Sequence, residues 1–237
     1  MRSIFCAMTG KILLVMHQET SNPGRVARQL RDLGYGLDLR RPSCGDPLPA
    51  NMDDHEGAVI FGGPMSANDD HLDYVRTEID WIETVLASGK PYLGICLGAQ
   101  MMVRTLGGQV RLHKDELVEI GYHQIKPTEA GEAIFDKPMC VYQWHKEGFD
   151  LPSGANLLAG GDRFDNQAFK YGDNGYGIQF HPEVTNGMMM HWLTAAAHML
   201  EMPGAQARVD QIKARRKFDN ETINWLRGFL QTWLNIA

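Results

Sequence analysis

The sequence predicts an α/β protein whose central sheet is open and mostly parallel, with helices on both faces in a three-layer arrangement. Between residues 11 and 106, short apolar runs alternate with longer amphipathic segments, as strands alternate with crossover helices. The run at 11–16, Lys-Ile-Leu-Leu-Val-Met, is continuously apolar after its lysine, as expected for a strand buried on both faces. A length of 237 residues supplies enough chain for one large domain of this class.

The first half of the chain gives the clearest elements. Glycines end two of its helices, at Gly34 and at Gly107-Gly108, where a left-handed backbone stops helical hydrogen bonding. A loop rich in proline, aspartate and glycine follows the second strand. The expected strands are 11–16, 35–40, 58–61 and 91–95, and the expected helices are 25–33, 74–87 and 97–106.

The second half is less regular. One or two strands are expected within 109–127, with a turn at 114–116, followed by strands at 139–144, 156–161, 167–171 and 175–180. Helices are expected at 188–200, 206–218 and 222–235, with a restart at Asp219-Asn220-Glu221. We therefore predict one domain over 1–237, in which 1–10 is a leader and about 200–237 is a C-terminal helical extension.

Composition excludes several classes of function. The formal net charge of −6 argues against nucleic acid or an anionic membrane as a partner. The four cysteines, at 6, 44, 96 and 140, show neither metal-site spacing nor the density of a disulfide scaffold. No apolar run approaches the roughly 20 residues of a membrane span. These features predict a cytoplasmic protein whose thiols stay reduced.

One cysteine lies where a strand turns into a helix. Residues 94–98 read Gly-Ile-Cys-Leu-Gly, and the glycines on either side of Cys96 allow a tight, strained turn. This is the pattern of a nucleophile elbow with cysteine in place of serine. The N-terminus of the following helix would favour a thiolate at Cys96. From this segment alone, a buried core cysteine between two packing glycines is an equal alternative.

A second segment supplies partners for a nucleophile. Residues 175–183 read Gly-Tyr-Gly-Ile-Gln-Phe-His-Pro-Glu, an apolar strand that ends in histidine, proline and glutamate. A cysteine nucleophile needs a base to move its proton, and the base needs an acceptor to orient it. His181 and Glu183 are two residues apart across a proline, so both side chains can project from the same end of the strand.

These motifs together resemble the class I (triad) glutamine amidotransferases, in the form of a stand-alone relative of the GMP synthase glutaminase domain. A third motif, Phe-Gly-Gly-Pro at 61–64, is similar to the oxyanion loop of that family. The three motifs occur in the family's order, and the resemblance covers roughly residues 11–195. It implies a flavodoxin-like fold and a catalytic triad of Cys96, His181 and Glu183.

The resemblance also implies roles for residues around the triad. The N–H groups of Gly63 and Leu97 would form the oxyanion hole, while Gly62 and Gln100 would contact the substrate. Trp144, His145 and Glu147 would complete the substrate site. Where the family commonly has His-Gly-Asp, this chain has His145-Lys146-Glu147, so Glu147 would hold the substrate's α-amino group with one extra methylene. His17 follows the first strand, and we interpret it as a loop histidine without a role in the chemistry.

Three functions remain open at this point. The first is hydrolysis of glutamine to glutamate and ammonia through a thioester, with the ammonia passed to a separate synthetase. The second is hydrolysis of γ-glutamyl peptides on the same triad. It is favoured by Lys146, which stands where the family commonly has glycine. The third, a binding or regulatory protein with a dormant site, fits poorly with an intact triad. The chemistry needs no metal, nucleotide or other cofactor, and the amphipathic C-terminal helix would pack on the domain or on a second copy in a homodimer.

Overall fold

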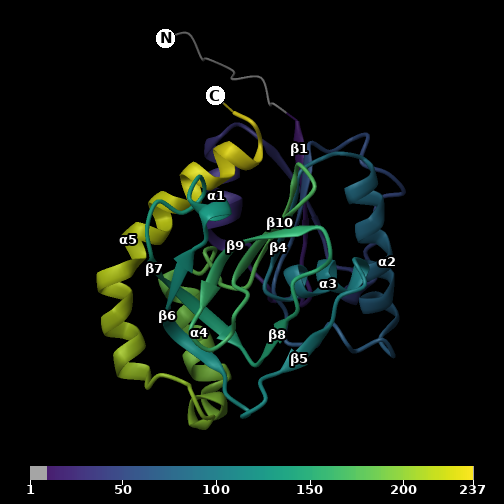
Figure 1. The fold of residues 1–237 in the computed structure, drawn as a ribbon. Helices are drawn as coiled ribbons and strands as arrows, with labels where there is room; N and C mark the ends of the chain where they lie inside the picture. The colour runs from purple at the N-terminus through teal and green to yellow at the C-terminus, as the bar shows by residue number, and fades with distance from the viewer. Residues whose placement is uncertain (1–9, 237) are drawn as a thin grey trace, which may run out of the picture.

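Figure 1 shows a computed structural model of the protein, which describes residues 10–236, so that the predicted leader at 1–10 falls almost wholly outside the described residues. Within them, a central sheet is built from β1 (Lys11–Val15), β2 (Gly36–Arg40), β3 (Gly57–Ile60), β4 (Tyr92–Ile95), β6 (Glu119–Pro127), β7 (Met139–His145), β9 (Ala155–Gly161), β10 (Ala168–Tyr171) and β11 (Gly175–Ile178). The strands β5 (Val110–Leu112) and β8 (Glu147–Phe149) form a second, two-stranded sheet.

The central sheet runs in the order β2-β1-β3-β4-β11-β10-β9-β6-β7. From β2 to β11 the strands are parallel, and from β11 onward each neighbour is antiparallel. The predicted α/β class is therefore confirmed, with an antiparallel half added beyond β11. Because parallel strands have their carboxyl ends at one edge, the segments after β1, β3, β4 and β11 meet there.

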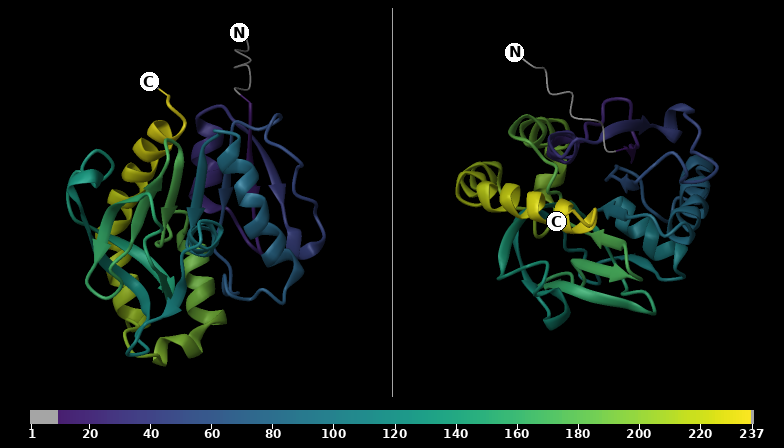
Figure 2. Two further views of the ribbon diagram at one scale, coloured as in Figure 1. Left: turned by 45° about the vertical axis from the view of Figure 1, so that its right-hand side comes forward. Right: turned by 90° about the horizontal axis from the view of Figure 1, so that it is seen from above.

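Helices cover both faces of the sheet (Figure 2). They are α1 (Gly24–Asp32), α2 (Asp73–Ala87), α3 (Leu97–Thr105), α4 (Asn186–Ala195) and α5 (Arg208–Trp233), together with short 3₁₀ turns at Pro42–Cys44, Glu129–Gly131 and Ala197–Glu201. One core cluster joins α1 and α5 to the sheet, and another joins α2 and α3 to its opposite face. Of the helices described in residues 10–236, none is long and apolar enough to cross a membrane.

The C-terminal segment differs from its prediction in two ways. The expected break at 219–221 is absent, because α5 is one continuous helix of 26 residues. Asp219 accepts hydrogen bonds from Arg25 at 2.8 and 2.6 Å and from Arg215, one turn earlier, at 2.9 Å, so these ion pairs hold the polar stretch within the helix. The helix expected at 188–200 instead divides into α4 and a 3₁₀ turn, because Ala196 leaves the helical region.

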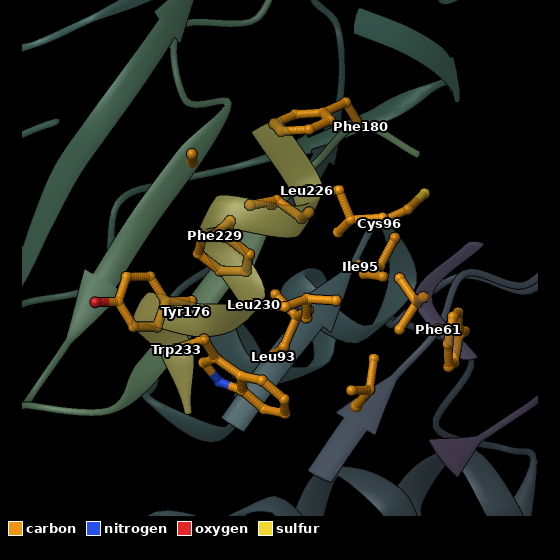
Figure 3. Packing of buried hydrophobic residues seen from close by; sticks show 14 of the residues in the cluster. Phe61, Leu93, Ile95, Cys96, Tyr176, Phe180, Leu226, Phe229, Leu230 and Trp233 are labelled. Carbon is orange, nitrogen blue, oxygen red and sulfur yellow. The ribbon is translucent and has the colours of Figure 1, made fainter. Parts of the chain in front are cut away.

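Helix α5 also supplies side chains to the core cluster that joins α1 and α5 to the sheet (Figure 3). Leu226, Leu230 and Trp233 are at most 1% exposed, and they pack in one cluster with Leu93 and Ile95 of β4. Full burial of an aliphatic side chain typically contributes about 1.5–3 kcal/mol to stability. The helix therefore supports, from one face, the strand that leads to Cys96.

Candidate active site

Cys96 is the single residue between β4 and α3, and its backbone is strained. Its dihedral angles are φ 51° and ψ −103°, a region that residues with a side chain rarely adopt. The turn can close because Gly94 and Gly98 have no side chains. A Cβ at Gly98 would lie 2.1 Å from the carbonyl oxygen of Ile60, and one at Gly94 would lie 2.5 Å from backbone atoms of Gly98. Strand, turn and helix thus pack as the elbow pattern predicts.

Cys96 is only 6% exposed and belongs to the core cluster that joins α1 and α5 to the sheet, but its sulfur has a polar side chain beside it. The amide of Gln179 donates to Sγ at 3.5 Å, and the backbone N–H of Cys96 donates to the carbonyl of Ile178 at 2.8 Å. The first N–H groups of α3 and the positive end of its dipole are directed toward the same place.

His181 and Glu183 form a buried pair beside the cysteine. His181 Nδ1 lies 2.7 Å from Glu183 Oε1, and the two residues are 4% and 3% exposed. Burial alone lowers the pKa of His181, but the negative charges of Glu183 and of a Cys96 thiolate outweigh it and raise the pKa to about 10. The charges around the ring therefore favour an imidazolium, and its Nε2 has no hydrogen-bond partner within residues 10–236.

The raised pKa of His181 predicts a pH dependence of stability. A group whose pKa is raised on folding stabilises the native state fully below its unfolded pKa, about 6.5 for histidine, and loses that contribution as the pH rises through the folded value. The unfolding free energy of the wild type relative to His181→Gln should therefore decline between about pH 6.5 and pH 10. Urea unfolding across this range measures the decline. A smaller slope in Glu183→Gln is expected, and an unchanged slope would contradict the assigned cause.

Gly62 lies against both Cys96 and His181. A Cβ built on it would be 2.7 Å from His181 Cε1 and 3.5 Å from Cys96 Cβ, so the site closes around a glycine. The structure thus brings Cys96, His181 and the loop after β3 together at the carboxyl edge of the sheet. Among the hydrogen bonds within residues 10–236, none uses the N–H of Gly63 or of Leu97. Both groups are available to an oxyanion.

Other residues predicted for the substrate site are engaged in internal hydrogen bonds. Gln100, 4% exposed, donates to the carbonyl oxygen of Glu147 at 2.9 Å and to Gln179 at 3.2 Å. His145, 5% exposed, lies 3.1 Å from Glu119 and 2.9 Å from the carbonyl oxygen of Glu147. Their direct contact with a substrate stays a prediction. With Gln179, they form a buried polar network that reaches from Cys96 to Glu119.

Trp144 and Glu147 lie nearer the surface. Trp144 packs against Trp192, whose ring in turn meets that of His181 edge-on at 5.1 Å. The Glu147 carboxylate accepts a hydrogen bond from Ser66 at 2.9 Å, which connects it to the loop that follows Gly63. Both side chains are partly exposed, and contact of Glu147 with a substrate α-ammonium, which the family resemblance implies, stays a prediction.

Two features of the site were not predicted from the sequence. The first is the contact of Gln179, which directly follows β11, with the sulfur; the sequence gives no signal for it beyond its place two residues before His181. The second is Glu78, a fully buried carboxylate on α2 that lies 2.8 Å from His17. A signal for it existed, because Glu78 occupies the apolar face of α2 at helical spacing from Val75, Ile82 and Val85.

A comparison with protein families agrees with this geometry. The family model described as glutamine amidotransferase class-I matches residues 14–198. The chain belongs to this family. It is 31% identical over 194 residues to the glutamine amidotransferase-like protein YfeJ of Salmonella typhimurium, a match that covers 76% of this chain and 80% of that protein. It is 28% identical over 194 residues to the glutamine-hydrolysing GMP synthase of Wigglesworthia glossinidia brevipalpis, covering 76% of this chain and 35% of that one.

Solved amidotransferase structures share the fold. A glutamine amidotransferase from Thermotoga maritima is 27% identical with a TM-score of 0.84, covering 95% of this chain and 98% of its own. Another from Methylobacillus flagellatus is 25% identical with a TM-score of 0.88, covering 98% and 96%. These matches confirm the predicted fold class and an enzyme of the class I amidotransferase family. The chain spans only about a third of the GMP synthases that it matches.

Proposed function

We propose that this protein hydrolyses the side-chain amide of glutamine to glutamate and ammonia, with Cys96 as nucleophile, His181 as general acid and base, and Glu183 as the group that orients His181. The observation that carries the proposal is the strained elbow that sets Cys96 beside the buried His181–Glu183 pair. A core cysteine needs neither a positive φ nor a buried imidazole held by a carboxylate. Energetically costly features of this kind concentrate at functional sites.

The reaction follows from these groups in two stages. The Cys96 thiolate attacks the amide carbon, a C–S bond forms, and the carbonyl electrons move onto oxygen. When the tetrahedral intermediate collapses, the C–N bond breaks and the proton of His181 goes to the departing nitrogen, giving ammonia and a thioester. His181 then takes a proton from water, hydroxide attacks the thioester, and the C–S bond breaks to release glutamate.

The oxyanion of each tetrahedral intermediate needs hydrogen-bond donors. We assign this role to the N–H groups of Gly63 and Leu97, which have no acceptor among residues 10–236. Loss of one such donor typically raises the barrier by about 3 kcal/mol. Glu183 accepts from the Nδ1–H of His181 and keeps Nε2 directed at the reacting atoms.

The leaving group distinguishes two versions of this function: glutamine releases ammonia, whereas a γ-glutamyl peptide releases an amino acid. The GMP synthases that the chain resembles are named as glutamine-hydrolysing, so we favour a separate synthetase as the acceptor. Hydrolysis of γ-glutamyl peptides is the second candidate, and the replacement of Gly-Asp by Lys146-Glu147 is the observation in its favour. Purified protein should release ammonia and glutamate from glutamine. Faster release of an amino acid from γ-glutamyl dipeptides would favour the second candidate, and hydrolysis of neither would reject the proposal.

Substitution of Glu147 should separate the two candidates further. If its carboxylate holds the α-ammonium of glutamine, Glu147→Gln should raise KM with little change in kcat, because that contact is equal in ground and transition states. Loss of a charged hydrogen bond costs about 1.5–3 kcal/mol, or roughly 10- to 150-fold in KM. Steady-state kinetics on glutamine measure the effect. Ser66→Ala is the control, because it removes the neighbour of Glu147 and keeps the charge.

The opposite outcome for Glu147 would have an equally clear meaning. If Glu147→Gln leaves KM for glutamine unchanged but impairs hydrolysis of a γ-glutamyl dipeptide, then free glutamine is not the substrate that this carboxylate recognises. Glu147→Asp should be tolerated under the glutamine reading, since it restores the carboxylate common in the family.

A further inference from the structure

A buried pair of ionisable side chains lies beneath the oxyanion loop. His17 and Glu78 are 1% and 0% exposed, and His17 Nε2 lies 2.8 Å from Glu78 Oε2. Glu78 projects from a face of α2 that otherwise buries apolar residues. Removing a carboxylate from water is costly even when it is paired, and an apolar residue there would often be at least as stable. The pair therefore calls for a role other than stability.

The second ring nitrogen of His17 identifies that role. His17 Nδ1 lies 3.2 Å from the carbonyl oxygen of Gly62, and a carbonyl oxygen can only accept. Nδ1 therefore carries a proton and donates to Gly62. Glu78 fixes this arrangement of the ring protons. The proton between His17 Nε2 and the Glu78 carboxyl can lie on either group, and Nδ1 keeps its own proton in both cases.

The carbonyl of Gly62 and the N–H of Gly63 belong to the same peptide unit. In a trans peptide the two groups point in opposite directions, and cis bonds are absent from the described residues. Fixing the carbonyl on His17 therefore aims the N–H of Gly63 away from His17. His17 also lies against Gly63 itself, where an added Cβ would be 2.8 Å from His17 Cβ, and Ser43 Oγ donates to the carbonyl of His17 at 2.9 Å.

We propose that His17 and Glu78 are positioning residues that hold the Gly62–Gly63 peptide so that the Gly63 N–H faces the oxyanion. The inference rests on the proposed amide hydrolysis. It adds a contact that orients the Gly62–Gly63 peptide, which no residue of the triad provides. A peptide between two glycines rotates freely compared with any other, so the loop needs an external contact to keep one orientation. His17 touches no reacting atom in the proposed reaction, so its role is to position the loop, whereas the sequence led us to interpret it as a loop histidine without a role in the chemistry.

Two substitutions of His17 test the proposal directly. His17→Leu removes the donor to Gly62, whereas the amide of His17→Asn can donate from nearly the place of Nδ1. Both lose the contact with Glu78, so they differ chiefly in the Gly62 hydrogen bond. For glutamine hydrolysis, His17→Leu should lower kcat by about 10²- to 10³-fold with little change in KM, and His17→Asn should recover at least about tenfold of that loss. Unchanged kcat in His17→Leu, or equal losses in two folded variants, would overturn the proposal.

A second measurement separates the oxyanion hole from general damage to the triad. Alkylation of Cys96 by iodoacetamide is a displacement at a saturated carbon and forms no oxyanion, so its rate should be the same in wild type and His17→Leu. A parallel fall in alkylation and kcat would assign His17 to the triad or to the fold and reject the positioning role. His55→Leu is the matched control, because His55 is also a buried histidine paired with a carboxylate, 3.0 Å from Asp38, and it should leave kcat unchanged.

A spectroscopic readout does not depend on turnover. In protein labelled with ¹³C-carbonyl and ¹⁵N glycine, only the Gly-Gly peptides at 62–63, 107–108 and 160–161 carry both labels across one bond. The 62–63 signal should shift in His17→Leu and return toward its wild-type position in His17→Asn, while the other two serve as internal references. An unmoved 62–63 signal rejects the positioning role. If the wild type hydrolyses no γ-glutamyl amide, the proposed function fails while this experiment still decides the orientation of the peptide.

Discussion

Replacing Cys96 with alanine is expected to abolish hydrolysis of glutamine and to leave the fold intact. The thiolate forms the only covalent bond to the substrate in the proposed reaction, and no other group at the site can replace it. The loss in kcat should be at least about 10⁴-fold. Alanine keeps the backbone of the elbow and removes one sulfur from the core. Release of ammonia measures the activity, and circular dichroism with thermal unfolding verifies the fold.

Labelling identifies the nucleophile independently of turnover. A glutamine-like chloroketone should modify Cys96 and no other cysteine, as mass spectrometry of the digested protein would show. Cys140 is the informative comparison, because burial and the charge of Glu221 raise the pKa of its thiol and so disfavour its thiolate. Cys44 is exposed and serves as the control for simple access. Equal labelling of Cys140, or full activity in Cys96→Ala, would overturn the assignment.

The second large effect is expected at His181. His181→Ala removes the group that moves both protons and should lower kcat by about 10⁴-fold, near the upper limit for general acid–base catalysis. Glu183→Ala should cost less, because the carboxylate orients and stabilises the imidazolium without moving a proton itself. Steady-state kinetics of the two variants, with KM and kcat separated, give the comparison.

The relative losses at His181 and Glu183 distinguish proton transfer by the histidine from its orientation by the glutamate. Glu183→Gln is the conservative control, since its amide keeps the shape and lacks the charge that raises the pKa of His181. Its activity should fall between those of the wild type and Glu183→Ala. Were a Glu183 variant more damaged than His181→Ala, Glu183 would have to contact the substrate directly, and the roles of the two residues would need to be exchanged.

The features that the sequence predicted well are those with local causes. The elbow depends on Gly94 and Gly98, each within two residues of Cys96, and the His181–Glu183 pair lies within a single tripeptide. Continuous apolar runs identified the parallel strands because these strands are buried on both faces. Because these strands are parallel, the motifs that follow them lie at one edge of the sheet.

The features that escaped prediction depend on partners far away in the chain. The helix α5 continues through Asp219 because Arg25, 194 residues away, binds the same carboxylate as Arg215. The sequence shows Asp219-Asn220-Glu221 only as a polar stretch suited to a helix start. In the same way, the sequence led us to interpret His17 as a loop residue, because its partners Gly62 and Glu78 lie 45 and 61 residues away in the chain.

The place of β4 beside β11 has a consequence for the newly made chain. Gln179, which touches the Cys96 sulfur, is 83 residues beyond it in sequence, and β11 joins β4 only after four strands of the antiparallel half have been synthesised. Contacts of such long sequence separation form late in folding, because a large loop must close first. An N-terminal portion that ends before β11 can contain the cysteine and its helix, yet it lacks the histidine and glutamate. The proposed site of Cys96, His181 and Glu183 is therefore assembled only in the completed fold.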